Sequence, residues 1–146
     1  MTYYNLQVHS AYDLLNSTIK YTELFSKLKK DGQDTVVITD PTLYGAIKAH
    51  KIAKKFDINL VHGLEIKLGY GISFLKFNIL CKNTEMFYRL LEISTMIENK
   101  VDWSIEKFVE ELKKSKEDFV IIVIDELRDS MEFSYLNDAL KGFDFY

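Results

Sequence analysis

Runs of apolar residues alternate along the chain with segments in which apolar residues recur every three or four positions. The β-branched run 35–39 and the apolar run 119–124 are typical of strands buried on both faces. Residues 21–28 and 49–56 each carry one apolar stripe, which predicts two amphipathic helices, the first ending at Gly32. Buried strands separated by one-sided helices predict an α/β fold, with largely parallel strands covered by helices.

Less regular patterns extend this plan through the middle of the chain. Residues 4–8 alternate like a short strand, and 59–68 are expected to form a strand that is broken at Gly63. The glycine-containing turn 69–71 should lead into a further strand, 72–80. A β-hairpin is therefore predicted here.

Two polar residues are placed to cap helices in the second half of the chain. Asn83, or Thr84 beside it, can cap one helix, and Ser104 can cap the next. The residues expected on the buried faces are Phe87, Leu90, Leu91 and Ser94 in the first helix, and Ile105, Phe108, Val109 and Leu112 in the second. Both helices are therefore predicted to be amphipathic.

Chain length limits the architecture. A closed barrel of eight strand-helix units needs about 250 residues, so a chain of 146 residues can supply only part of a barrel or a small open sheet. A weaker helix around 136–140 is followed by 143–146, which resembles the opening of a strand with nothing after it. We expect one domain, 1–146, that is a fragment of a larger protein.

Composition narrows the classes of function. The net charge is −3 with few arginines, whereas domains that bind nucleic acid by themselves are usually basic, so no autonomous nucleic-acid binding is expected. The lysine clusters within 27–30 and 51–55 are explained as solvated helix ends. The lone Cys81 excludes an internal disulfide and a thiolate zinc site. Without an apolar span or signal layout, no membrane association and a cytoplasmic location are expected.

Candidate chemistry lies at the predicted carboxyl ends of the strands, where functional residues of parallel α/β folds gather. The residues there are His9 with Ser10, Asp40, His62 with Glu65, and Asp125 with Glu126. Three of these positions could bind a metal ion. Structural alternatives exist, because a lone histidine is often only hydrogen-bonded and an aspartate before proline commonly bonds the backbone of the turn.

Several other site classes have no signature in this chain. There is no glycine-rich phosphate loop, no GxSxG elbow and no HExxH helix. Cys81 ends an apolar strand and is explained best as a small residue at the edge of the core. Nucleotide hydrolysis, serine hydrolysis and cysteine nucleophile chemistry are therefore not expected.

Four segments together resemble a known family. LQVHSAYDLLNS (6–17) is similar to HxHSxYSLLDG, the opening of the PHP (polymerase and histidinol phosphatase) domain of bacterial DNA polymerase III alpha subunits. The segment 36–69, with its ITDP and GLE motifs, resembles the second block of that family, and 75–95 and 103–124 follow the later blocks more loosely. The resemblance implies a distorted βα barrel of PHP type with a metal cluster at the strand ends. It also implies fusion to polymerase domains.

The sequence departs from the family at its metal-ligand positions. The positions that correspond to family ligands hold Gln7, Asn16, Pro41 and Lys76, while His9, Asp40 and Glu65 remain as candidate metal ligands. A hydrolytic cluster needs several donors around two or three ions, and proline offers no side-chain donor. We therefore expect a degenerate site with no catalytic residue and no resident cofactor.

Lys76 suggests a specific replacement for the metal. Its ammonium group, placed among His9, Asp40 and Glu65, would repel divalent ions and neutralise the carboxylates itself. The alternative is that Lys76 points to solvent from an edge strand.

Two functions follow from the resemblance, and a third holds if the shared segments are due to chance. The first is a non-catalytic PHP module of a DNA-directed DNA polymerase (a nucleotidyltransferase that uses magnesium), which acts in DNA replication as a structural or docking platform. Its partners would be the remainder of the polymerase chain and a proofreading exonuclease subunit. The second is a metal-dependent phosphoesterase or 3'-5' exonuclease, with zinc or manganese on His9, Asp40 and Glu65. The third is an unrelated small α/β binding module.

Overall fold

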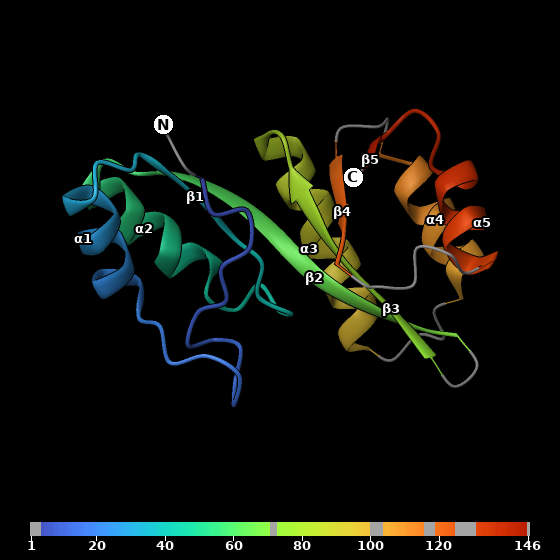
Figure 1. The fold of residues 1–146 in the computed structure, drawn as a ribbon, viewed down its shortest axis with the longest axis horizontal. Helices are drawn as coiled ribbons and strands as arrows, with labels where there is room; N and C mark the ends of the chain where they lie inside the picture. The colour runs from blue at the N-terminus through green and yellow to red at the C-terminus, as the bar shows by residue number, and fades with distance from the viewer. Residues whose placement is uncertain (1–3, 71–72, 100–103, 116–118, 125–130, 146) are drawn as a thin grey trace. The chain divides into compact units, whose positions relative to one another are not determined.

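The computed structural model describes residues 4–70, 73–99, 104–115, 119–124 and 131–145 (Figure 1). The chain forms two compact units, Met1–Leu64 and Glu65–Tyr146. In the order of hydrogen-bonded neighbours, the strands run β1-β2-β3-β4-β5. The expectation of one domain that belongs to a larger protein stays a prediction.

The first unit is built on parallel strands. β1 (Thr35–Ile38) pairs in parallel with the beginning of β2 (Asn59–Tyr70), and Val37 lies opposite Val61. The predicted strand 4–8 is reduced to a single parallel bridge between Val8 and Ile38. Parallel pairing of β-branched residues buried on both faces is what the sequence pattern predicts.

Two helices pack against each other in the first unit, as Figure 1 shows. They are α1 (Tyr21–Lys30) and α2 (Ala46–Phe56). Their apolar stripes meet the strands in one core that contains Phe25, Val36, Ile38, Ala49 and Ala53, among others. The C-terminal end of α1 is followed by Gly32 with a φ of 71°, the left-handed conformation that glycine adopts easily.

The second unit combines antiparallel and parallel pairing. β3 (Ser73–Cys81) pairs antiparallel with β4 (Phe119–Val123), and β4 pairs in parallel with β5 (Asp144–Phe145). β2 and β3 are neighbours in the sheet, in agreement with the predicted hairpin. Ile79 lies opposite Ile121, and both are fully buried.

Three helices complete the second unit: α3 (Thr84–Glu98), α4 (Ile105–Lys113) and α5 (Met131–Ala139). The predicted caps are confirmed, because the side chain of Asn83 accepts a hydrogen bond from the Met86 amide and that of Ser104 accepts one from the Lys107 amide. Arg89 joins α3 to α4 through hydrogen bonds to the carboxylate and backbone carbonyl of Glu111.

Two sequence predictions about these elements are wrong. β2 continues without a break through Gly63, because residues on both sides of the glycine remain extended. The predicted buried face of α3 is right for Leu90 and Ser94 but wrong for Leu91, which is exposed; Met86 and Ile93 complete the buried face. Residues 86–93 form a broad apolar arc beside Arg89 and Glu92, so the pattern alone does not select which part of the arc meets the core.

None of the helices in the described part of the chain is both long and apolar enough to span a membrane.

Candidate functional site

The loop that follows Val8 contains His9, the first candidate ligand. His9 Nδ1 lies 2.5 Å from Oδ2 of Asp13, and Oδ1 of Asp13 accepts a hydrogen bond from the Asn16 amide at 2.9 Å. The Nε2 atom of His9 lies 3.5 Å from the side-chain amide of Gln7. Three of the positions expected to form the degenerate metal site are thus connected through this loop.

Asp13 is a residue that sequence reasoning missed. It is buried, and its carboxylate is the centre of the contacts between His9 and Asn16. Its position in the segment 6–17 corresponds to a serine of the family pattern, so the resemblance gave no reason to single it out. The available signal was its place four residues after His9 in a turn-forming segment.

Asp40 lies just after β1 and is 3% exposed. Its Oδ1 atom accepts a hydrogen bond from the Ser10 backbone amide at 2.6 Å. Its Oδ2 atom accepts bonds from the Ser10 hydroxyl at 2.5 Å and the Tyr21 hydroxyl at 3.3 Å. Hydrogen bonds to an ionised acceptor are the strong ones. The carboxylate therefore joins the loop after Val8 to the end of β1 and to α1.

This arrangement differs from the structural alternative drawn from the sequence. In that alternative Asp40 bonds the backbone of the turn at Pro41, whereas in the structure it accepts a bond from the backbone amide of Ser10, thirty residues earlier in the chain. Pro41 is partly buried and begins the segment that leads to α2.

The Tyr21 hydroxyl remains a donor to this cluster. Burial raises the pKa of Tyr21 well above its ordinary range, and the negative charge of Asp40 raises it further, while the hydrogen bond with Ser10 opposes the shift. The ring stacks between Tyr12 and Phe25, with centroids 5.6 and 6.0 Å away. The phenol is therefore held in place and protonated.

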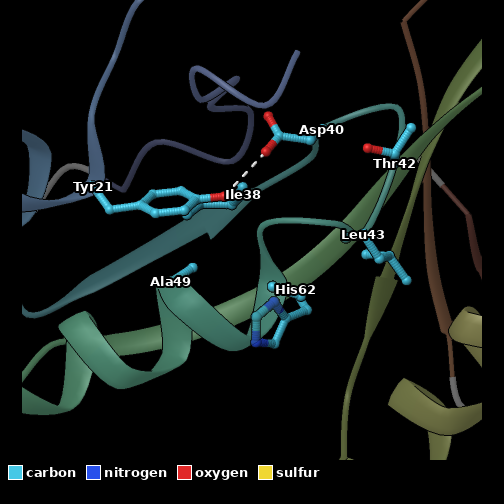
Figure 2. Close-up of a pocket in the computed structure, with 9 residues that line it drawn as sticks. Tyr21, Ile38, Asp40, Thr42, Leu43, Ala49 and His62 are labelled. Atoms are coloured by element: carbon cyan, nitrogen blue, oxygen red, sulfur yellow. Dashed lines mark hydrogen bonds between the residues drawn. The ribbon is translucent and has the colours of Figure 1, made fainter. Parts of the chain in front are cut away.

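A small cavity lies beside this cluster (Figure 2). Its lining includes Tyr21, Asp40, Thr42 and His62, and its volume is about 10 Å³. This is about the space for a single water molecule. Burial lowers the pKa of His62 to about 4, with a smaller contribution from His50. His62 is therefore neutral at neutral pH.

Glu65 belongs to the second unit and lies within β2, not at its carboxyl end as predicted, because the strand continues to Tyr70. The Lys76 Nζ atom on β3 lies 2.8 Å from Glu65 Oε2, and Lys67 Nζ lies 3.6 Å from Oε1. The Glu65 side chain is 3% exposed and that of Lys76 is 33% exposed. A buried carboxylate is thus paired with a half-buried ammonium group.

The remaining candidate residues do not complete a set of metal ligands in the part of the chain that the structure describes. Within the part of the chain that the structure describes, no three His, Cys, Asp or Glu side chains come together as a group able to hold a metal ion. Burial raises the pKa of Cys81 to about 11, which keeps its sulfur protonated and unreactive at neutral pH. Asp125 and Glu126 lie outside the described residues.

The residues present do not fit the metal cluster that the family resemblance implies. His9 is bonded to Asp13, Asp40 to Ser10 and Tyr21, and Glu65 to two lysines. His9 and Asp40 belong to the first unit and Glu65 and Lys76 to the second, so the prediction that all four meet stays a prediction.

Comparison with known families identifies the fold. The model of the PHP domain family matches residues 5–132. The chain belongs to the PHP domain family. This PHP domain is homologous to DNA polymerase III subunit alpha: it is 35% identical to that of Bacillus subtilis over 104 residues (68% of the chain), and 32% identical to that of Staphylococcus epidermidis over 121 residues (81%).

The PHP domain corresponds to a small part of these relatives. It spans 9% of the Bacillus subtilis protein and 11% of the Staphylococcus epidermidis protein. Among solved structures, an amidohydrolase from Chromobacterium violaceum superposes with a TM-score of 0.56 at 11% identity, covering 93% of this chain and 74% of that one. At that identity the likeness concerns the fold, and it agrees with the predicted α/β architecture of PHP type.

Proposed function

We propose that this chain is the N-terminal PHP module of a bacterial replicative DNA polymerase III alpha subunit, and that the module is non-catalytic. It would act in DNA replication as a structural or docking platform for the remainder of the polymerase chain, with a proofreading exonuclease subunit as a further partner. The parent protein would be a cytoplasmic, magnesium-dependent nucleotidyltransferase. The homology to DNA polymerase III subunit alpha supports the replicative context.

The pairing of Glu65 with Lys76 is the observation that carries the non-catalytic assignment. A carboxylate that is 3% exposed needs a nearby positive charge, which a metal ion or a side-chain cation can supply. Here the Lys76 ammonium group lies at 2.8 Å and Lys67 contributes a second positive charge at 3.6 Å. A divalent ion approaching Glu65 would be repelled by both lysines.

The first unit supports the same conclusion independently. The Asp40 carboxylate accepts hydrogen bonds from neutral donors of Ser10 and Tyr21, and these bonds fix the loop and the start of α1. Moving Asp40 onto a metal would break these bonds. In this proposal the remaining candidate ligands, His9, Asp40 and Glu65, have structural roles. They do not hold the metal ions that water activation needs.

Metal content tests the proposal directly. The chain, purified without chelator, should contain far less than one zinc or manganese ion per molecule by mass spectrometry. It should not hydrolyse bis(p-nitrophenyl) phosphate when either metal is added. Stoichiometric metal with metal-dependent hydrolysis, abolished by His9→Ala, would refute the non-catalytic assignment.

A restoration series sharpens the test. The triple variant Gln7→His, Pro41→His and Lys76→His returns donors to two family ligand positions of the first unit and one of the second, and the prediction that these positions meet requires it to bind zinc or manganese more tightly than the unmodified chain. A matched control replaces Lys67 instead of Lys76 with histidine, which leaves the ammonium group of Lys76 in place. The reasoning predicts weaker metal binding in the control, measured by calorimetric titration of each variant.

A further inference from the structure

The loop between Val8 and α1 exposes two adjacent leucines. Leu14 is 77% exposed and Leu15 is fully exposed. Leu15 also has a φ of 70°, in the left-handed region. In Figure 1 this loop is the blue segment that runs away from β1 before it returns to α1. The first unit therefore presents a pair of large apolar side chains to solvent.

The conformation of Leu15 is unfavourable by itself. A left-handed backbone costs a residue with a Cβ atom about 1–2 kcal/mol, and glycine, asparagine or aspartate usually occupies such positions. Strained residues persist where the surrounding structure determines their conformation, and they cluster at functional sites. A single exposed leucine is ordinary, but an adjacent pair held in a strained turn calls for a physical reason.

Hydrogen bonds on both sides of the leucines hold the turn. The Asp13 carbonyl accepts bonds from the backbone amides of Asn16 at 3.2 Å and Ser17 at 3.1 Å. The Asn16 side chain donates to the Asp13 carboxylate, and the Ser17 hydroxyl donates to the His9 carbonyl at 2.7 Å. The Ala11 amide donates to the Ile19 carbonyl at 2.8 Å, which closes the base of the loop.

The loop is thus fixed by the positions where relatives are expected to bind metal. Asp13 lies between His9 and Asn16, and Asp40 holds Ser10 at the start of the loop. A loop that is already rigid loses little conformational entropy when its exposed side chains bind a partner. Two rigid, exposed leucines are therefore suited to insertion into a preformed apolar pocket.

We infer that Leu14 and Leu15 dock into an apolar pocket on another domain of the same polypeptide. This inference rests on the proposed function, and it specifies the surface through which the module contacts the rest of the polymerase. The relatives are about ten times as long as the matched region, so a polymerase of this kind has a large surface available to cover the loop. Residues 10–19 contain no lysine or arginine, which disfavours the phosphate backbone of nucleic acid as the occupant.

Cysteine labelling in the full-length polypeptide tests the docking. A Leu15→Cys variant and a Lys30→Cys control, both at exposed positions, are prepared in the full-length protein and in the 146-residue chain. Labelling with a maleimide is followed by peptide-resolved mass spectrometry, and Cys81 serves as a slow internal reference because its thiol is partly buried and protonated. Circular dichroism checks that each variant of the chain is folded.

We expect Leu15→Cys to react at least about tenfold more slowly in the full-length protein than in the chain, while Lys30→Cys reacts at similar rates in both. Equal rates for Leu15→Cys would overturn the inference, as would a reading frame that ends without a further domain. Slow, concentration-dependent labelling in the chain alone would show instead that a second copy covers the loop, which also overturns it.

A second measurement needs no substitution. Hydrogen exchange of the backbone amides of residues 11–17 should be slower in the unmodified full-length protein than in the chain, since docking excludes water from the turn. Unchanged exchange would contradict the docking. The metal measurements above decide the proposed function separately, so a metal-free module with an undocked loop would refute this inference alone.

Discussion

Removal of the Lys76 ammonium group should destabilise the second unit through Glu65. Two unit charges 2.8 Å apart attract by about 6 kcal/mol at an effective dielectric constant of about 20. Lys76 is one-third exposed and Lys67 remains at 3.6 Å, so solvent and the second lysine compensate part of the loss. We expect Lys76→Met to lower the free energy of unfolding by about 2–3 kcal/mol, at or just below the lower limit of about 3 kcal/mol for breaking a fully buried pair.

The assay is equilibrium urea unfolding followed by circular dichroism, with EDTA present so that metal binding cannot contribute. Lys67→Met is the matched control, because it removes a more exposed lysine that lies farther from the same carboxylate; its cost should be within about 0.5 kcal/mol. The double variant Glu65→Gln, Lys76→Met removes the buried charge as well, and should be more stable than Lys76→Met alone.

Three outcomes would refute this reasoning. Equal, small costs for Lys76→Met and Lys67→Met would show that Glu65 does not depend on the closer lysine. A double variant no more stable than Lys76→Met would show that the uncompensated carboxylate is not the source of the loss. Stabilisation of the unmodified chain by zinc or manganese would show that a metal competes with Lys76 for the carboxylate.

Three further predictions concern the first unit. A Cβ atom at Gly45 would overlap the Tyr21 hydroxyl, which is held by its own hydrogen bonds, so Gly45→Ala should cost about 2 kcal/mol in urea unfolding; a neutral effect would show that the tyrosine can move. The pKa of His62 is lowered to about 4, so the unfolded chain takes up a proton that the folded chain does not between pH 6.5 and 4. Stability should therefore fall by about 2 kcal/mol from pH 7 to pH 5, and an unchanged pH slope in His62→Phe would contradict this cause. Leu15→Asn should raise the stability of the chain by about 0.5–1 kcal/mol, because asparagine tolerates the left-handed backbone, whereas Leu14→Asn should give no such gain.

The spacing of apolar residues predicted correctly the helices that bury a single apolar stripe. The α4 face of Ile105, Phe108, Val109 and Leu112 is buried as expected, because only one arrangement removes all four from water. The face of α3 was predicted correctly at Leu90 and Ser94 but not at Leu91, because a broad arc of that helix is apolar and its orientation is decided by the packing of the second unit. Gly63 was expected to break β2, but strand pairing overrides the weak preference of a single glycine.

The sequence predicted which residues belong to the candidate site better than it predicted the groups that they contact. His9, Asp40 and Glu65 were singled out by their positions near strands, but their partners are set by tertiary contacts. Asp13 was missed because its importance comes from a turn that brings His9 and Asn16 to its two carboxylate oxygens. The pairing of Lys76 with Glu65 was foreseeable only as one of two alternatives, since the sequence does not give the register of β2 and β3.

The burial of Asp40 has a consequence for how such domains are classified. An aspartate that anchors a loop through Ser10 and Tyr21 would be kept by selection for folding alone, even after every ion had been lost. An aspartate retained at this position would then indicate common descent, and it would not indicate catalytic activity. A sequence search for inactive PHP domains should therefore compare the histidine positions and the position of Lys76. It should give no weight to Asp40.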